Sequence, residues 1–241
     1  MSELRKRALA AYAEYYQTQN TQDLNPTLAR PSSHRNYDIN FGHFVRSVPG
    51  GGRMLDVGCG TGFLVHWLSK QPGITAVGVD GSESQVALAK KFMPNVEMVC
   101  DDALHYLKAH PNEFAGIFCM DVLQLFADED FLFDWVLATY NALRPGGFFC
   151  AQLVNCASLI GPYNIFMDVL GARGFTSGSA RQLFTLAGFK DVRICNQRTA
   201  GFSGLVRFKL EQWMHRAVFL ISGNGAERVF SRSLTAVGYR R

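Results

Sequence analysis

The pattern of apolar and polar residues is most regular between about residues 53 and 154. Short apolar runs alternate there with longer stretches in which apolar residues recur every three to four positions, as on one face of a helix. The pattern predicts five strands separated by helices, at residues 53–58, 74–80, 96–100, 114–121 and 146–154. Strands that alternate with helices form a parallel sheet with right-handed crossovers. The sequence therefore predicts an α/β fold with helices on both faces of the sheet.

The pattern before this region is helical but interrupted. Residues 3–17 and 37–47 are predicted to be helices, and residues 21–36 are predicted to be irregular because Pro26 and Pro31 punctuate them.

The pattern after residue 155 lapses until residue 176. It resumes with a helix over residues 177–189, for which Ser177 or Ser179 could be the N-cap and Gly188 the C-cap. Two further strands are predicted at the end of the chain, at residues 191–197 and 233–239, with a helix of about residues 205–221 between them.

The composition favours one soluble domain. The 241 residues are 48% apolar, and 24 Lys and Arg against 20 Asp and Glu give a net charge of only +4 with no basic tract, which disfavours nucleic-acid binding. No uninterrupted apolar stretch approaches the roughly 18 residues of a membrane span, and no apolar segment follows the basic N-terminus, so we expect a cytoplasmic protein. The six cysteines lack CxxC spacing and are expected to be reduced core residues.

A glycine-rich loop follows the first strand of the core. The strand ends at Asp56, and the sequence then runs Gly58, Cys59, Gly60, Thr61, Gly62 into a helix. Open α/β sheets bind ligands at this carboxyl edge, and glycines let a nucleoside or a phosphate approach the backbone. A tight turn between strand and helix would also require glycine, so the loop alone is a weak signal.

The second strand strengthens this signal. It ends at Asp80, followed by Gly81 and Ser82, and an acid about twenty residues beyond the glycines can accept hydrogen bonds from both ribose hydroxyls. The spacing is GxGxG, not the GxGxxG of dinucleotide sites, and Asp56 would repel a phosphate. The sequence therefore predicts a nucleoside ligand that carries positive charge, such as a sulfonium or an ammonium.

Five motifs occur in order between about residues 52 and 150: "LDVGCGTG", the acid of "VGVD", "DDA" at 101–103, "MDVL" at 120–123 and "LRPGGFF" at 143–149. Together they resemble the class I S-adenosylmethionine-dependent methyltransferases. The resemblance implies a Rossmann-like, seven-stranded, mostly parallel sheet with the last strand antiparallel and an N-terminal helical cap. It also implies S-adenosyl-L-methionine as the cofactor and S-adenosyl-L-homocysteine as its product.

The resemblance implies a cofactor site at the ends of the first four strands. Its glycines would contact the methionine part, the acid after the second strand the ribose, and the "DDA" residues the adenine. The residues so assigned are Asp56, Gly58, Cys59, Gly60, Thr61, Gly62, Asp80, Gly81, Ser82, Asp101, Asp102, Ala103, Met120, Asp121 and Val122. Tyr16, with its helical neighbours Tyr12 and Tyr15, could cover the cofactor or instead pack on the sheet.

These assignments divide one methyltransferase domain into three parts. We expect a helical cap over residues 1–48, the cofactor-binding core over residues 49–155 and an acceptor-side segment over residues 156–241.

The methyl acceptor is predicted by elimination. The chain lacks the Asn/Asp-Pro-Pro-aromatic loop of nucleic-acid amino-methyltransferases and the paired glutamates of protein-arginine methyltransferases, and only Asp121 and Asn155 stand where metal-dependent relatives carry several acids. We therefore expect no metal and no nucleic acid. Residues 154–189 and 221–241 are similar to segments of bacterial surface-polysaccharide methyltransferases, which favours O-methylation of a small molecule, a sugar or a glycan precursor.

The proton acceptor is not given by the resemblance, because many such relatives carry histidines where this chain has Leu125 and Gly171. The base could come from elsewhere, with Tyr163, Asp168, His34 and Tyr37 as candidates. The acceptor could need no base, as in a carboxyl- or N-methyltransferase of natural products, or the protein could bind the cofactor without catalysis. A nicotinamide dehydrogenase is disfavoured by the glycine spacing.

The last long helix, about residues 205–221, mixes apolar residues with Arg207, Lys209 and Arg216. Basic residues and Trp213 suit a membrane surface. A lid over the acceptor or a dimer contact is the favoured alternative, and the chain is expected to be a monomer or a homodimer.

Overall fold

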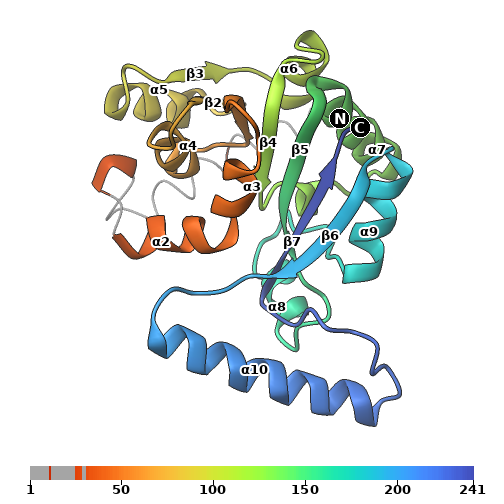
Figure 1. Ribbon diagram of the computed structural model, residues 1–241. Coiled ribbons are helices and arrows are strands. Elements are labelled where there is room, and N and C mark those ends of the chain that lie inside the picture. Colours follow the sequence, from red (N-terminus) through yellow and green to blue (C-terminus); the bar gives the residue numbers. More distant parts are fainter. Residues whose placement is uncertain (1–10, 12–24, 29–30) are drawn as a thin grey trace.

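The computed structural model describes Ala11, residues 25–28 and residues 31–241, and it shows one mixed sheet flanked by helices (Figure 1). The seven strands lie in the order β3-β2-β1-β4-β5-β7-β6, and β7 runs antiparallel to both of its neighbours. This is the predicted Rossmann-like, mostly parallel sheet with a reversed last strand, so the fold prediction is confirmed. The strands are β1 (Gly52–Val57), β2 (Ile74–Asp80), β3 (Glu97–Cys100), β4 (Phe114–Met120), β5 (Leu143–Val154), β6 (Lys190–Asn196) and β7 (Ser233–Tyr239).

Helices cover both faces of the sheet, and one helix stands apart from it (Figure 1). They are η1 (Pro26–Leu28), α2 (Pro31–Asn40), α3 (Gly42–Arg46), α4 (Phe63–Ser69), α5 (Glu83–Phe92), α6 (Ala103–Ala109), η2 (Leu123–Leu125), α7 (Glu129–Ala142), α8 (Gly161–Phe166), α9 (Ser177–Leu186) and α10 (Phe202–Ile221). The predicted helix over residues 3–17 lies outside the described residues.

Two apolar cores hold these layers together, one on each face of the sheet. On one face Trp135 of α7 packs with Phe149 of β5 and Phe184 of α9, and the rings of Phe149 and Phe184 stack at 5.0 Å. On the other face Trp67 of α4 belongs to a core with Phe148 of β5. Both tryptophans are 1% exposed, as predicted for core residues. The sheet is therefore fixed on both sides, and its carboxyl edge is left to the connecting loops.

Three local predictions were wrong. Pro31 begins α2 instead of interrupting the chain, because proline fits the first turn of a helix, where no backbone N–H donor is needed. The predicted helix over residues 37–47 is divided at Phe41 into α2 and α3. The N-cap of α9 is Thr176, neither Ser177 nor Ser179, and its side chain and that of Ser179 form a reciprocal capping box.

Two more details differ from the predicted pattern in the C-terminal half. The segment predicted to be irregular, residues 156–176, contains the short helix α8. The C-cap of α9 is Ala187, and Gly188 follows it with a φ of +98°, the left-handed conformation that suits glycine.

Candidate active site

Acidic residues gather at the carboxyl edge of the sheet, where the strand order reverses. Asp56 lies in β1, Asp80 ends β2, Asp101 follows β3 and Asp121 follows β4. Since β3, β2, β1 and β4 are adjacent and parallel, their carboxyl ends lie side by side. The topology thus places the acids of four separate motifs around one site.

The glycine loop between β1 and α4 has a backbone that only glycine adopts easily. Gly58, Gly60 and Gly62 have φ angles of +75°, +55° and +89°. A Cβ atom at Gly58 would lie 2.5 Å from Val122, and one at Gly60 would lie 2.7 Å from Gln85. The glycines are therefore required by the fold itself. The same property leaves the backbone of the loop bare beside the acids.

Asp80 is fixed against this loop. Its Oδ2 accepts the N–H of Gly60 and its Oδ1 accepts the N–H of Ser82, both at 2.8 Å. Burial raises the pKa of this carboxyl, and the two backbone donors act in the opposite direction. Each carboxylate oxygen can accept a second hydrogen bond, so Asp80 can still bind hydroxyl groups of a ligand.

Asp56 is buried beneath the loop and is only 3% exposed. Its Oδ1 has no hydrogen-bond partner among the described residues. Burial, together with the negative charge of Asp80, raises the pKa of Asp56 to about 8. Because a buried carboxylate is costly without a counter-charge, this position favours a cation nearby. Cys59 and Thr61 of the same loop are also buried, and burial raises the pKa of the Cys59 thiol.

The acids after β3 hold the backbone of their own loop. Oδ1 of Asp102 caps α6 by accepting the N–H of His105 at 3.0 Å, and Oδ1 of Asp101 accepts the N–H of Asp102 at 2.7 Å. Asp101 also lies 2.8 Å from Nδ1 of His105, which raises the pKa of that exposed histidine. Ala103 is the first residue of α6. This loop lies beside β2, where the resemblance puts the adenine.

Asp121 stands at the turn between β4 and η2, between Met120 and Val122. Its φ of +58° is uncommon for a residue with a side chain. Its carboxyl accepts the side-chain N–H of Gln124 at 3.2 Å and that of Gln152 of β5. Surrounding protein raises the pKa of Asp121, although part of its side chain remains in contact with solvent. The carboxyl is therefore fixed in position and still accessible.

A chain of polar side chains continues from Asp121 along the carboxyl edge. The Nε2 of Gln197, just after β6, donates to Oε1 of Gln152 and, at 3.3 Å, to Oγ1 of Thr235 in β7. Sequence reasoning missed these residues. The available signal was Gln152, a polar residue within the otherwise apolar run "FFCAQLV".

Tyr37 of α2 lies near two of these acids, Asp56 and Asp121. Its ring is 6.1 Å from that of Phe41 and 5.7 Å from that of Trp67. Burial and the charges of Asp56 and Asp121 raise the pKa of Tyr37 to about 12. The structure thus brings this candidate close to both acids, and its phenol keeps its proton at neutral pH.

Two asparagines of α2 bind the segment that leaves β6. Oδ1 of Asn40 accepts the N–H of Arg198, and Nδ2 of Asn40 donates to the carbonyl of Arg198, both at 2.9 Å. Oδ1 of Asn36 accepts the N–H of Ala200 at 2.7 Å. These bonds join α2, on the N-terminal side of the core, to the segment that carries Gln197.

The other candidate bases lie elsewhere. The ring centroid of His34 is 5.3 Å from that of His66 in α4, and its Nε2 is buried without a partner in the described part of the chain. Tyr163 is 68% exposed on α8, and Oδ1 of Asp168 accepts the N–H of Leu170 in the turn after α8. Tyr16 lies outside the described residues.

The two positions where relatives carry histidine have different surroundings. Leu125 ends the short helix η2. At Gly171 a Cβ atom would lie 2.1 Å from the carbonyl oxygen of Ile165 and 3.0 Å from that of Asp168. No histidine fits at Gly171 unless the backbone moves, so this loop has no space for such a base.

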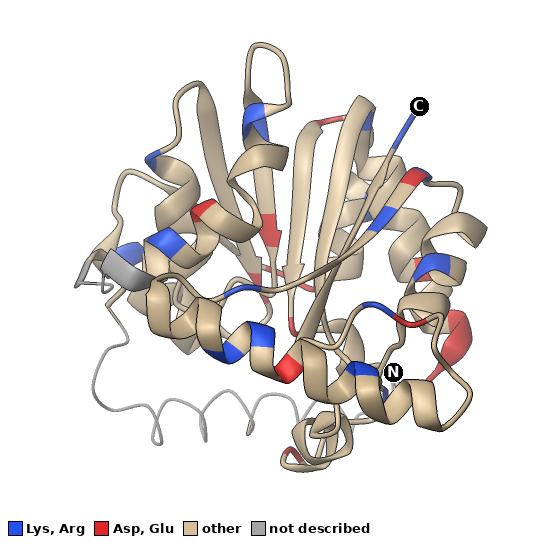
Figure 2. Ribbon diagram, turned by 60° about the horizontal axis from the view of Figure 1, so that its bottom comes forward, with Lys and Arg blue, Asp and Glu red and all other residues tan. Residues whose placement is uncertain are grey.

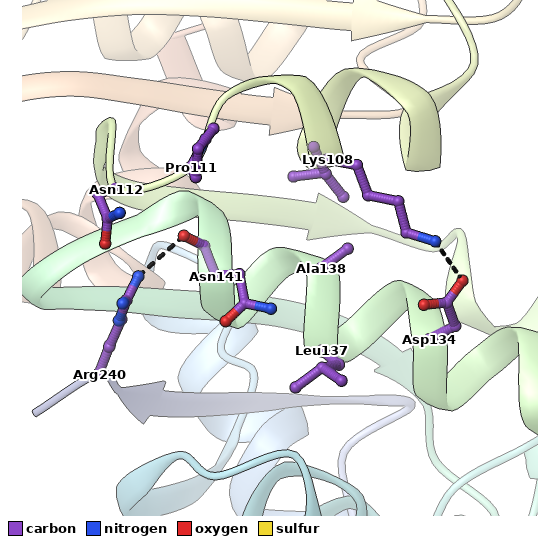
Figure 3. Close-up of a pocket in the computed structure, with 9 residues that line it drawn as sticks. Lys108, Pro111, Asn112, Asp134, Leu137, Ala138, Asn141 and Arg240 are labelled. Carbon is purple, nitrogen blue, oxygen red and sulfur yellow. Dashed lines mark hydrogen bonds and ion pairs between the residues drawn. The ribbon is translucent and has the colours of Figure 1, made fainter.

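A separate recess of about 370 Å³ lies at the amino ends of β4 and β5, between α6 and α7 (Figure 3). Its charged groups are already paired: Lys108 contacts Asp134 at 2.7 Å, and Arg240 donates to the carbonyl of Asn141 at 2.8 Å. It lies at the opposite edge from the acids and is not part of the candidate site. Among the residues that the structure describes, no group of three or more His, Cys, Asp or Glu forms a metal site.

The family and sequence comparisons agree with this geometry. Residues 54–147 match the family model described as "Methyltransferase domain". The ubiquinone biosynthesis O-methyltransferase of Thiobacillus denitrificans is 31% identical over 115 residues, which are 46% of this chain and 48% of that protein. The ribosomal RNA large subunit methyltransferase G of Pseudoalteromonas atlantica is 32% identical over 106 residues, 43% of this chain and 27% of that protein. The chain thus spans about half or less of the curated relatives it matches.

Solved structures show the same fold. A SAM-dependent methyltransferase from Archaeoglobus fulgidus superposes with a TM-score of 0.64 at 18% identity, covering 86% of this chain and 94% of that one. Phosphoethanolamine N-methyltransferase 2 of Haemonchus contortus, solved with S-adenosyl-L-methionine, gives 0.59 at 19% identity, covering 90% and 60%. Residues 54–147 therefore match a methyltransferase domain, and the chain has the fold of the class I S-adenosylmethionine-dependent methyltransferases.

Proposed function

We propose that the protein transfers the methyl group of S-adenosyl-L-methionine to a hydroxyl group of a small molecule. The observation that carries the cofactor assignment is the buried carboxyl of Asp56, which lies beside Asp80 and whose Oδ1 has no hydrogen-bond partner among the described residues. A cationic ligand would stabilise the ionised form of both acids, whereas a nucleotide phosphate would be repelled. The family match of residues 54–147 supports the same ligand.

The residues at the carboxyl edge suit the parts of this cofactor. The bare backbone at Gly58, Gly60 and Gly62 would accommodate the methionine part, Asp80 would accept the ribose hydroxyls, and Asp102 with Ala103 would lie at the adenine. Met120 to Val122 would flank it along the end of β4. When bound, the cofactor supplies a methyl group that its positively charged sulfur has already activated. The protein must then align the acceptor, exclude water and remove one proton from a hydroxyl.

Asp121 is the group we assign to proton removal. Its carboxyl is accessible, is held by Gln124 and Gln152, and has a raised pKa, which makes it a better base than an ordinary surface aspartate. Tyr37 is a poor base because its phenol stays protonated at neutral pH, and we assign it a hydrogen bond that orients the acceptor. Gln152 and Gln197 add amide groups that can bind further hydroxyls.

One group among the named relatives favours a hydroxyl acceptor. The ubiquinone biosynthesis O-methyltransferases match about 40–50% of this chain at 26–31% identity. Their name places the methyl group on oxygen. A base at Asp121 agrees with this, because a hydroxyl must lose its proton whereas a carboxylate need not.

Calorimetry tests the cofactor assignment. We expect S-adenosyl-L-homocysteine to bind the protein and NAD not to bind. Asp80→Ala should weaken the binding of S-adenosyl-L-homocysteine by at least about a hundredfold, because two hydrogen bonds from the ribose hydroxyls to a charged acceptor are lost. Asp134→Ala, which removes an exposed acid from the distant recess, should bind normally. Unchanged affinity of Asp80→Ala, or binding of NAD alone, would contradict the proposal.

Labelled cofactor tests the reaction. The protein is incubated with panels of small phenols and sugars, carboxylic acids and amines, and the products are identified by mass. Transfer to a hydroxyl compound is expected. Transfer to acids or amines alone would support a methyltransferase activity but would contradict the proposal that the acceptor is a hydroxyl group.

A further inference from the structure

Helix α10, inserted between β6 and β7, shows an apolar face to the outside of the molecule. Only Gly204 and His215 of this helix are buried. At 100° per residue, the opposite side of the helix collects seven apolar residues within about 100°. They are Phe202, Val206, Leu210, Trp213, Ala217, Leu220 and Ile221. Phe202, Trp213 and Ile221 are 82%, 74% and 88% exposed, so much of this outward face is open to solvent.

Basic residues border the outward face on both sides. Lys209 and Arg216 fall on one flank and Arg207 on the other, and the helix carries blue bands along its length with a single red one (Figure 2). The one acid, Glu211, lies 3.8 Å from Arg207. Among the described residues no acid is within ion-pair distance of Lys209 or Arg216. An apolar face bordered by cations is complementary to the surface of an anionic bilayer. The apolar residues can enter the acyl-chain region while the cations contact the lipid phosphates.

The same charges disfavour a second copy of this chain as the partner. In an antiparallel pair of α10 helices about a twofold axis, each flank meets the same flank of the other helix. Lys209 and Arg216 of one copy would then face those of the other, and two chains of net charge +4 would be brought together. The apolar area alone would permit such a dimer, but the flanking charges favour a negatively charged partner.

The anchoring of α10 sets its direction relative to the candidate site. Nε2 of Gln212 donates to Oδ1 of Asn196 at the end of β6 (3.1 Å). Nε2 of His215 accepts the N–H of Leu159, which precedes α8 (2.9 Å). Both contacts are on the inner side of the helix and join it to the carboxyl edge of the sheet. The segment around α8 adds exposed apolar residues next to α10: Leu159, Ile160, Phe166, Met167 and Val169.

We propose that α10 lies in the plane of an anionic lipid bilayer, with its outward face in the acyl region and its basic flanks at the headgroups. No helix among the described residues is long and apolar enough to cross a membrane, so the helix rests on the surface. Docked in this way, it places the carboxyl edge of the sheet toward the bilayer, where an amphipathic acceptor would be concentrated. The docking itself does not depend on the proposed methyl transfer.

Co-sedimentation with vesicles tests the proposal on the full chain. We expect binding to mixed phosphatidylcholine–phosphatidylglycerol vesicles, weaker binding to phosphatidylcholine alone, and a decrease as salt is raised. Leu210→Glu with Trp213→Glu should lower binding to mixed vesicles at least tenfold, because two anchoring side chains become acidic. Lys209→Gln with Arg216→Gln should lower it about 25-fold, since each cation near the surface contributes about 1 kcal/mol, a factor of about five.

Leu186→Glu is the matched control, because Leu186 is an equally exposed apolar residue on α9, remote from α10. It should bind vesicles like the unmodified protein. All variants should keep their affinity for S-adenosyl-L-homocysteine, so loss of cofactor binding would be seen separately from loss of membrane binding. The proposal is overturned if the protein does not sediment with mixed vesicles, or if the Leu210 and Trp213 variant sediments normally. A concentration-dependent dimer that this same variant abolishes would also overturn it, in favour of a second copy.

Discussion

The carboxyl edge of the sheet and helix α10 are opposite departures from ordinary protein design. At the carboxyl edge the chain buries carboxyl groups, with Asp56 hidden beneath the glycine loop and Asp80 beside it. On α10 it exposes apolar side chains such as Trp213. Neither arrangement stabilises the isolated protein, because a buried acid loses hydration and an exposed apolar face gains nothing. Each becomes favourable beside a partner of matching character: a cation for the acids, an apolar phase for the helix.

The largest expected effect is on catalysis at the carboxyl edge. Asp121→Asn should lower kcat by about 10²–10⁴-fold, because the proposed proton acceptor is lost; its amide oxygen can still accept a hydrogen bond from one of the two glutamines, Gln124 or Gln152. Affinity for S-adenosyl-L-homocysteine should stay within a few-fold, which steady-state kinetics and calorimetry together will show. In the unmodified protein the rate should rise with pH as Asp121 ionises, and the variant should lose this rise.

Asp134→Asn is the control for this variant and should leave kcat unchanged. If the Asp121 variant has a normal kcat, or only binds the cofactor more weakly, Asp121 is not the base. Its role would then be the cofactor contact that the sequence motif predicts.

The second effect concerns the cost of burying Asp56. Its folded pKa of about 8 lies above the unfolded value of about 3.9, so the stability it contributes is complete below pH 4 and is lost as pH rises through 8. At pH 8 the free energy of unfolding of Asp56→Asn should therefore exceed that of the unmodified protein by about 2 kcal/mol, and at pH 4 the two should differ little. Urea denaturation at both pH values measures this. Equal stability of the two proteins at pH 8 would show that the carboxyl is not strained by its burial.

The same group should make cofactor binding depend on pH. Between pH 6 and pH 8 the affinity for cationic S-adenosyl-L-methionine should rise several-fold more than that for the uncharged thioether of S-adenosyl-L-homocysteine. Calorimetry in buffers of different ionisation enthalpy should detect proton release when the cation binds. Asp56→Asn should remove the difference between the two ligands, and a difference that persists would assign the effect to another acid.

The smallest expected effect is on the stability of α10 variants. Leu210→Glu with Trp213→Glu should change the free energy of unfolding by no more than about 0.5 kcal/mol per site, because both side chains are already exposed. Chemical denaturation without lipid measures this. A loss of several kcal/mol would mean that the outward face packs on part of the protein. The face would then not be available to a partner.

The residues predicted for the cofactor side of the site could be selected from the sequence because the features that mark them are local. Each lies within a few residues of a strand end, and strands alternating with helices leave little freedom in topology. The position of Asp80 beside the glycine loop follows from that pattern alone.

The proposed acceptor side could not be predicted in this way, because its residues come from distant segments. Tyr37, Asp121 and Gln197 are brought to the same edge of the sheet only through the packing of α2, β4 and the end of β6. The sequence offered Tyr37 beside three other candidates with equal support, and only burial between aromatic rings and acids distinguishes it.

By itself, then, the sequence determined the alternation of strands and helices and the acidic character of the candidate site, because periodicity and motif spacing are properties of neighbouring residues. The reversed last strand was implied by the family resemblance. Tertiary structure decided which acid is buried, why Gly171 cannot be histidine, and which side of α10 faces outward. The sequence of a helix with mixed apolar and basic residues does not show which side faces the protein; the packing of its neighbours decides this. Here the side with Gly204 and His215 is buried, and the apolar face points outward.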